Sequence, residues 1–228
     1  MTLTYFGHSA FQIETGAATL LFDPFITGNP LAEPVVSPES LNPDVIILTH
    51  AHGDHWGDTM AIARRSGAMI VANYEITTYA QGQGHDRVQP MNTGGAWSFA
   101  WGRLTQTYAR HSSSFPDGTY GGNPNGYLVH LDDTVVYCAG DTCPFAEMAW
   151  LGEDHAIDLA LLPIGDCFTM GPTGAVRAAR MLKPRLTIPL HYDTFPPIQV
   201  DTDAWAASMR DAGFATRVLG PGDVHVLR

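Results

Sequence analysis

The sequence has few cysteines and no pattern that would pair them. Cys138, Cys143 and Cys167 are its only three, an odd number without a C-x-x-C motif. Disulfide frameworks and thiolate metal sites need more numerous or more closely spaced cysteines. We therefore expect each cysteine to be a small buried hydrophobic residue in a protein of a reducing compartment.

Basic residues are also scarce, with 12 Lys+Arg against 23 Asp+Glu and a formal net charge of -11. The arginines, such as Arg64, Arg87 and Arg110, are scattered along the chain instead of forming a stripe. A large nucleic acid needs clustered positive charge. The composition therefore favours a small-molecule substrate and argues against a large nucleic acid as partner.

Long apolar runs are missing as well. The first residues, MTLTYFGHSAF, contain neither a basic nor an apolar signal region, and no later run approaches the length of a membrane span. We expect a cytoplasmic protein that does not bind membranes. Because no linker or low-complexity tract divides the chain, we predict one domain over residues 1–228. Aromatic residues in the Pro-rich loops and at Trp150 are candidates for a homo-oligomer contact.

Short apolar runs of strand type alternate with helical patterns along the chain. We expect helices at 58–68, 76–84, 172–183 and 202–213, and a surface loop at the proline-rich segment 26–43. Strands are expected at 3–15, 18–23, 44–50, 68–72, between 97 and 129, at 135–142, 157–166 and 185–191, and in two closing pieces at 216–220 and 223–227. This order suggests sheet layers covered by helices.

The densest chemical signal is T-H-A-H-G-D-H at residues 49–55. His50 and His52, two positions apart, can point to the same side of an extended segment and grip one ion. Asp54 and His55 follow Gly53, which permits an unusual backbone turn, and they can serve a second ion. Burying these polar side chains without a metal would be costly. A closed structural zinc site is the alternative, but it would favour cysteine ligands.

Several apolar runs end in a residue that can bind a metal, and strand ends can converge at one rim of a sheet. Two catalytic ions need about six ligands. We predict His50, His52 and His111 for the first ion, Asp54, His55 and His191 for the second, and Asp141 between them. Asp166 also ends such a run. The remaining histidines His85, His130, His155 and His225 are expected to be hydrogen-bonded structural residues.

The H-x-H-x-D-H stretch resembles the signature of the metallo-β-lactamase superfamily. The segments GHSAF, DPFITGNP, HSSSFPDGTYGGNPNG, AGDT, IGDCFTMGP and LHYDTFPPI are similar to small metal-dependent hydrolases related to ascorbate-6-phosphate lactonase. The resemblance implies an α/β (α+β) fold, the four-layer αββα sandwich, with a dinuclear metal site at one sheet edge and the ligand set above. It also implies that His8 lies near the metals. One departure is that Thr173 and Gly174 follow T-M-G-P, where the family often has acidic residues.

The expected chemistry is hydrolysis by a hydroxide that bridges two divalent ions. Zinc is the first expectation, and manganese, iron, cobalt and nickel also suit histidine and carboxylate ligands. Asp54 would orient the nucleophile, and His8 would stabilise the oxyanion or protonate the leaving group. Asp23 and Thr49 are candidates for outer hydrogen bonds to the ligands. By resemblance, the substrate is a small ester or lactone. The alternatives are a phosphodiesterase and a non-hydrolytic metal-binding or redox di-iron protein.

Overall fold

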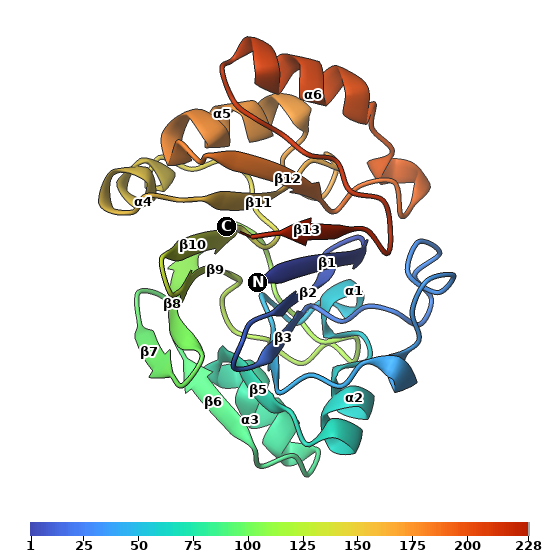
Figure 1. Cartoon of the computed structure of the whole chain (residues 1–228). Helices are drawn as coiled ribbons and strands as arrows, with labels where there is room; N and C mark the ends of the chain where they lie inside the picture. The colour runs from blue at the N-terminus through green and yellow to red at the C-terminus, as the bar shows by residue number, and fades with distance from the viewer. Residues whose placement is uncertain (228) are drawn as a thin grey trace.

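Two β-sheets lie face to face and carry helices on their outer sides in the computed structural model, which describes residues 1–227 (Figure 1). In spatial order, the first sheet contains β13 (Val224–Val226), β1 (Thr2–Gly7), β2 (Ala10–Glu14), β3 (Thr19–Phe22), β4 (Val45–Ile47), β5 (Met69–Asn73) and β6 (Val88–Met91). The second contains β12 (Leu186–Leu190), β11 (Leu159–Pro163), β10 (Thr134–Cys138), β9 (Asn125–Leu131), β8 (Gly102–Tyr108) and β7 (Ala96–Phe99).

The helices form the two outer layers. The first sheet is accompanied by α1 (Gly53–Trp56), α2 (Thr59–Ser66) and α3 (Tyr74–Gly82), and the second by α4 (Met148–Asp154), α5 (Pro172–Leu182) and α6 (Thr202–Asp211) (Figure 1). Short 3-10 turns, η1 (Pro38–Ser40) and η2 (Pro196–Ile198), lie in the connecting loops. Local signals set the helix ends: the Asp201 carboxylate accepts the Ala204 N–H at 2.9 Å, and Gly67 ends α2 with a left-handed φ of 71°. The predicted αββα sandwich is confirmed.

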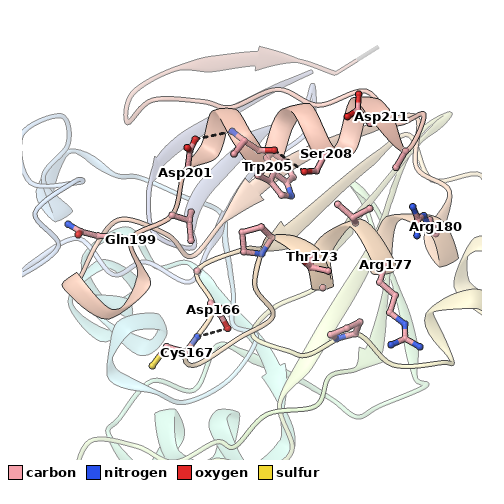
Figure 2. A pocket seen from close by; sticks show the side chains of 18 of the residues that line it. Asp166, Cys167, Thr173, Arg177, Arg180, Gln199, Asp201, Trp205, Ser208 and Asp211 are labelled. Carbon is pink, nitrogen blue, oxygen red and sulfur yellow. Dashed lines mark hydrogen bonds between the residues drawn. The ribbon is translucent and has the colours of Figure 1, made fainter.

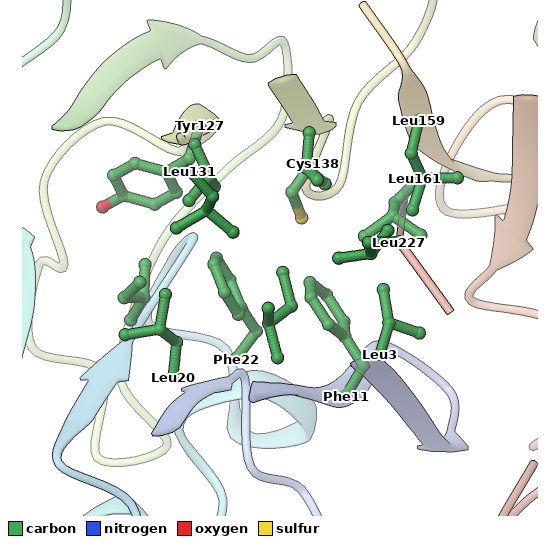
Figure 3. Packing of buried hydrophobic residues seen from close by; sticks show 14 of the residues in the cluster. Leu3, Phe11, Leu20, Phe22, Tyr127, Leu131, Cys138, Leu159, Leu161 and Leu227 are labelled. Carbon is green, nitrogen blue, oxygen red and sulfur yellow. The ribbon is translucent and has the colours of Figure 1, made fainter. Parts of the chain in front are cut away.

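Both faces of each sheet are buried along the central strands, whereas the edge strands β7 and β13 are partly exposed. Leu20 and Phe22 point between the sheets, whereas Leu21 points to the helices outside, as the two-residue period of a strand requires. Between the sheets, the rings of Phe11 and Phe22 stack at 4.5 Å and face apolar side chains such as Leu161 of the second sheet (Figure 3). This core holds the two sheets in a fixed relation, so the loops at their common edge have fixed positions.

Strand direction determines which loops share that edge. Strands β3, β4, β5 and β6 run parallel to one another, and so do β10, β11 and β12. The carboxyl ends of parallel strands meet at one edge of a sheet. The loops that follow β4, β10 and β12 therefore lie at common rims, and these loops carry most of the predicted ligands.

Some expectations were wrong. The pattern did not indicate α4, because only Met148 of this helix is buried and its sequence has no clear apolar stripe. Segment 216–220 is not a strand: it makes a single bridge, from Thr216 to Thr187, while crossing from the second sheet toward β13 in the first. Cys138 is buried as expected, but Cys143 and Cys167 are exposed because both lie in loops after strand ends. No helix within residues 1–227 is long and apolar enough to cross a membrane.

Candidate metal centre

The sandwich brings all seven predicted ligands to one place. They come from loops after strands of both sheets: β4 leads to the histidine-rich stretch, β8 to His111, β10 to Asp141 and β12 to His191. The side chains fall into overlapping groups whose possible ligand atoms lie within 4.8 Å of one another. The predicted convergence of strand ends is therefore present for these residues.

The first group contains His50, His52 and His111. His50 Nε2 lies 3.0 Å from His52 Nδ1, so the two imidazoles present nitrogens to the same point. The backbone of His52 is extended, with φ -59° and ψ 150°, which permits this two-residue spacing. The His111 ring packs 5.1 Å from that of His50 and 5.0 Å from that of His52.

The second group contains Asp54, His55 and His191, together with His8. Asp54 and His55 belong to α1, a single helical turn that Gly53 begins. Gly53 does not adopt a positive φ, so the expectation of an unusual glycine turn was wrong. The helical turn itself points the side chains of Asp54 and His55 away from the direction of His52, since successive residues of a helix point in different directions. His191 Nε2 lies 3.7 Å from Asp54 Oδ2.

Asp141 connects the two groups. Its Oδ2 atom lies 3.0 Å from His191 Nε2, 3.3 Å from His55 Nε2, 3.6 Å from His111 Nε2 and 3.9 Å from His50 Nε2. One carboxylate oxygen thus faces histidines of both groups. The carboxylate is buried in the centre of the cluster, with its side chain only 3% exposed.

Outer hydrogen bonds orient the histidines, as predicted for Asp23 and Thr49. Asp23 Oδ2 lies 2.8 Å from His55 Nδ1 and accepts the Thr49 hydroxyl at 2.6 Å, while Asp23 Oδ1 accepts the Thr49 N–H at 2.8 Å. Thr49 Oγ1 lies 3.1 Å from His50 Nδ1. With Nδ1 engaged in this way, His50 and His55 turn Nε2 toward the cluster, which is the usual arrangement for metal-binding histidines.

The backbone is strained at the cluster. His8, Asp23 and His191 have φ angles of 57°, 41° and 54°, in the left-handed region that non-glycine residues rarely adopt. Each such residue costs about 1–3 kcal/mol and persists only where the surrounding structure holds it. Strain at three neighbouring positions is typical of a functional site.

Charge coupling in the cluster is strong. Burial disfavours the charged form of His191, but Asp141 outweighs it and raises the pKa of His191 to about 9. The pKa of His55 is likewise raised, since Asp141 and Asp23 outweigh its burial. The pKa of Asp141 lies well below its usual range, because His191 and His55 outweigh the effect of burial. In contrast, burial and His191 lower the pKa of His8 to about 4.

These residues fit divalent metal ions. His55 Nε2 and Asp141 Oδ1 are buried without a hydrogen-bond partner among the described residues, which would be costly unless another group satisfied them. Imidazole nitrogens and carboxylate oxygens are ligands for zinc and similar metals. A divalent ion would compete with protons for His55 and His191 and would balance the acidic side chains at the centre.

Asp166, the other residue at the end of an apolar run, does not join the cluster. It is exposed, has a φ of 60°, and its Oδ1 accepts the Cys167 N–H at 3.0 Å. Figure 2 shows Asp166 and Cys167 at the edge of a cavity of about 1280 Å³ between α5 and α6, which none of the seven predicted ligands lines. Thr173, where the sequence departs from the family pattern, also borders this cavity (Figure 2).

The other four histidines lie outside the described groups, and among the described residues the expected side-chain hydrogen bonds are present for His85 and His225 but not for His130 and His155. His85 Nε2 contacts the Ala68 carbonyl at 2.9 Å, and His225 Nδ1 contacts Arg217 at 3.1 Å. The rings of His130 and His155 pack against each other at 5.3 Å.

Three neighbours of the cluster lie in segments that carry the family resemblance, although the residues themselves were not predicted individually. Phe25 and Phe195 pack against the ring of His8 at 5.8 Å and 5.6 Å, and Thr194 Oγ1 lies 2.9 Å from His8 Nδ1. Their segments, DPF and YDTF, contain no ligand pattern of their own. The rings of Phe25 and Phe195 form an apolar wall beside the second group, and only the fold brings these two distant segments together.

Comparisons with known proteins agree with this architecture. Residues 18–192 match the model of the family described as "Beta-lactamase superfamily domain". The chain is 53% identical to a UPF0173 metal-dependent hydrolase of Salinibacter ruber, over 100% of both chains, and 48% identical to a UPF0173 metal-dependent hydrolase of Thermus thermophilus, over 96% of each. Igni18, a metallo hydrolase of the archaeon Ignicoccus hospitalis, superposes with a TM-score of 0.90 at 36% identity, over 100% of this chain and 99% of that one.

Proposed function

Because the chain belongs to the beta-lactamase superfamily, and within it to the UPF0173 metal-dependent hydrolases, we propose that its whole length acts as one hydrolase domain with a dinuclear metal centre. His50, His52 and His111 would hold the first ion, Asp54, His55 and His191 the second, and Asp141 would bind both. Zinc suits this ligand set, as do manganese, iron, cobalt and nickel.

The position of Asp141 is the observation that carries this proposal. Its Oδ2 atom lies within 3.0–3.9 Å of histidine nitrogens from both groups. A single mononuclear site would need only one of these groups. Two ions about 3.5–4 Å apart with a shared carboxylate are the usual form of a two-metal hydrolytic site.

When bound, the two ions would supply a hydroxide nucleophile at neutral pH, bridging between them, and a positive field for the developing oxyanion. The chain's own residues supply orientation. The Asp54 side chain is 29% exposed, and His191, His55 and His8 hold its pKa below the usual range despite the opposing effect of burial. It therefore stays ionised near neutral pH, can accept a hydrogen bond from the nucleophile and can orient it.

We propose a small ester or lactone as substrate. Phe25 and Phe195 offer apolar contact beside the second group, which suits the carbon skeleton of a small ester better than a polyanion. The net charge of -11 supports the same choice over nucleic acids. The contrasting prediction is phosphodiester hydrolysis, which needs the same two ions.

Paired substitutions test the metal centre. Asp141→Asn is expected to lower the metal content from near two ions per chain and to reduce turnover by orders of magnitude, with an unchanged circular dichroism spectrum. Asp166→Asn is the matched control, because it alters another aspartate after a strand end that contacts neither group. Unaltered metal content and turnover in Asp141→Asn would refute the shared-ligand assignment.

A substrate panel tests the reaction. The wild-type protein, loaded in turn with zinc, manganese, iron, cobalt and nickel, is assayed on small lactones, carboxylic esters and phosphodiesters. Turnover of lactones or esters supports the proposal. Cleavage of phosphodiesters alone would overturn the substrate class, and absence of turnover on all three with a loaded centre would favour the non-hydrolytic alternative.

A further inference from the structure

His8 occupies a turn position that normally takes glycine. The hairpin between β1 and β2 closes through His8 and Ser9, and only the first of these two residues has a positive φ, as in a type II′ turn. Glycine usually fills that position because a side chain there is strained. His8 is nevertheless fully buried, and its carbonyl accepts the Tyr5 hydroxyl at 3.2 Å and the His191 N–H at 2.8 Å.

The turn delivers the imidazole to the second group. His8 Nε2 lies 3.1 Å from Asp54 Oδ2, and the ring centroid lies 4.0 Å from that of His191. Ligands about 2.1 Å from one ion are separated by about 3.0 Å along an octahedral edge and about 3.4 Å along a tetrahedral edge. The 3.1 Å between His8 Nε2 and Asp54 Oδ2 matches the separation of two ligands on one ion, and it is also the length of a direct hydrogen bond between the two side chains.

Hydrogen bonding on the far side of the ring favours the same role. Thr194 Oγ1 has the Tyr192 carbonyl within 3.3 Å as an acceptor for its single proton, and in that orientation it accepts the Nδ1–H of His8 at 2.9 Å. In this tautomer neutral His8 carries its proton on Nδ1, and the lone pair of Nε2 faces Asp54; in the other tautomer Nε2–H donates to Asp54. With the proton on Nδ1, His8 Nε2 and Asp54 Oδ2 face each other as two acceptors, which is favourable when a cation lies beside them. His55 has the same arrangement, with Nδ1 at Asp23 and Nε2 inward.

We propose that His8 is an additional ligand of the second metal ion. This inference rests on the proposed dinuclear centre and makes that centre asymmetric. The first ion has three histidines and Asp141, whereas the second has His8, Asp54, His55, His191 and Asp141. Five protein ligands exceed the four of tetrahedral zinc. The second position therefore favours a five- or six-coordinate ion, of the class of manganese, iron, cobalt or nickel.

His8→Gly is the most informative variant, because glycine suits the positive φ and removes the imidazole without straining the turn. We expect a folded protein whose metal content falls from near two ions per chain to near one after dialysis. The affinity of the second site should fall by more than about 100-fold, beyond the 10–100-fold loss typical of an outer hydrogen-bond partner. Free imidazole added to the variant should restore the second ion.

A cobalt spectrum and two control variants distinguish ligation from a structural role. Wild-type protein with two cobalt ions should show the weak visible absorption of a five- or six-coordinate ion, and His8→Gly should lose that component. His85→Ala removes another buried histidine, one that bonds to the Ala68 carbonyl, and should keep both ions. Thr194→Val leaves the imidazole in place and should weaken the second ion only 10–100-fold.

The outcomes separate this inference from the proposed function. If wild-type protein binds two ions and His8→Gly binds both with unchanged affinity, the dinuclear centre stands and the role of His8 as a ligand is refuted. Wild-type protein that binds fewer than two ions would refute the dinuclear centre itself. Loss of the second ion without rescue by imidazole would also count against direct ligation.

Discussion

The variant Asp23→Asn tests how the outer hydrogen bonds would control metal binding. Asp23 accepts three hydrogen bonds, from the Thr49 N–H, the Thr49 hydroxyl and His55 Nδ1–H. An asparagine has only one acceptor oxygen, and its amide group donates. If that oxygen stays on the Thr49 N–H, the amide group faces His55 Nδ1 and forces the ring proton onto Nε2, the atom that faces Asp141.

A protonated Nε2 cannot bind a metal. To bind one, the variant must return the His55 proton to Nδ1 or leave a buried polar group without a hydrogen-bond partner. The opposite orientation of the asparagine leaves the Thr49 N–H without an acceptor, which costs about 1–3 kcal/mol. Outer partners of ligating histidines contribute 10–100-fold to metal affinity, which corresponds to about 1.4–2.7 kcal/mol. We expect a loss of this size at the second ion and little change at the first.

Competition with a chromophoric chelator measures both dissociation constants. Asp44→Asn is the matched control, because the exposed Asp44 carboxylate also accepts a backbone N–H, from Thr19 at 2.9 Å, but lies outside the cluster. We expect one weakened dissociation constant in Asp23→Asn and none in Asp44→Asn. Equal affinities in wild-type protein and Asp23→Asn would refute the claim that Asp23 sets the tautomer of His55.

Two other perturbations address the loop contacts and the charge coupling. A Cβ atom at Gly121 would lie 2.3 Å from Ala51 Cβ, so Gly121→Ala should lower stability by about 1–3 kcal/mol in urea unfolding and weaken metal binding, whereas Gly16→Ala, with open space around it, should do neither. In metal-free protein, the pKa of His191 is raised from about 6.5 to about 9, so the folded chain holds this proton more tightly than the unfolded chain does. The protonated side chain therefore adds about 3 kcal/mol to the free energy of unfolding. This contribution is complete below pH 6.5 and is lost as the pH rises through 9. Urea unfolding at pH 6.5 and pH 9 checks this, and a metal-free protein equally stable at both values would contradict it.

The strand-end pattern predicted that these side chains converge, because it depends on chain direction. His50, His111, Asp141 and His191 follow strands whose ends share a rim, and the structure brings them together. Asp166 follows the same pattern but faces away, since its loop turns through two left-handed residues and folds the carboxylate back onto Cys167. An apolar run therefore predicts where a strand ends, but the path of the following loop depends on contacts distant in the sequence.

The family resemblance placed His8 near the metal ligands, but the spacing of residues alone could not predict its contacts, for the same reason. Its place depends on a hairpin turn near the start of the chain and on contacts with Thr194 and His191, more than 180 residues later. Sequence spacing contains no information about such a pair. Helix α4 was missed for a local reason: a seven-residue helix with one buried side chain leaves no periodic pattern.

The distribution of the ligands over both sheets also affects how the protein matures. The histidine-rich stretch belongs to the first sheet, Asp141 and His191 to the second, and β13 completes the first sheet only with the last residues of the chain. A growing chain would display His50 and His55 long before His191 leaves the ribosome. Folding and metal affinity are coupled when a site is assembled from distant segments. The proposed ions would therefore be acquired late, and a loaded centre would report that the two halves have closed on each other.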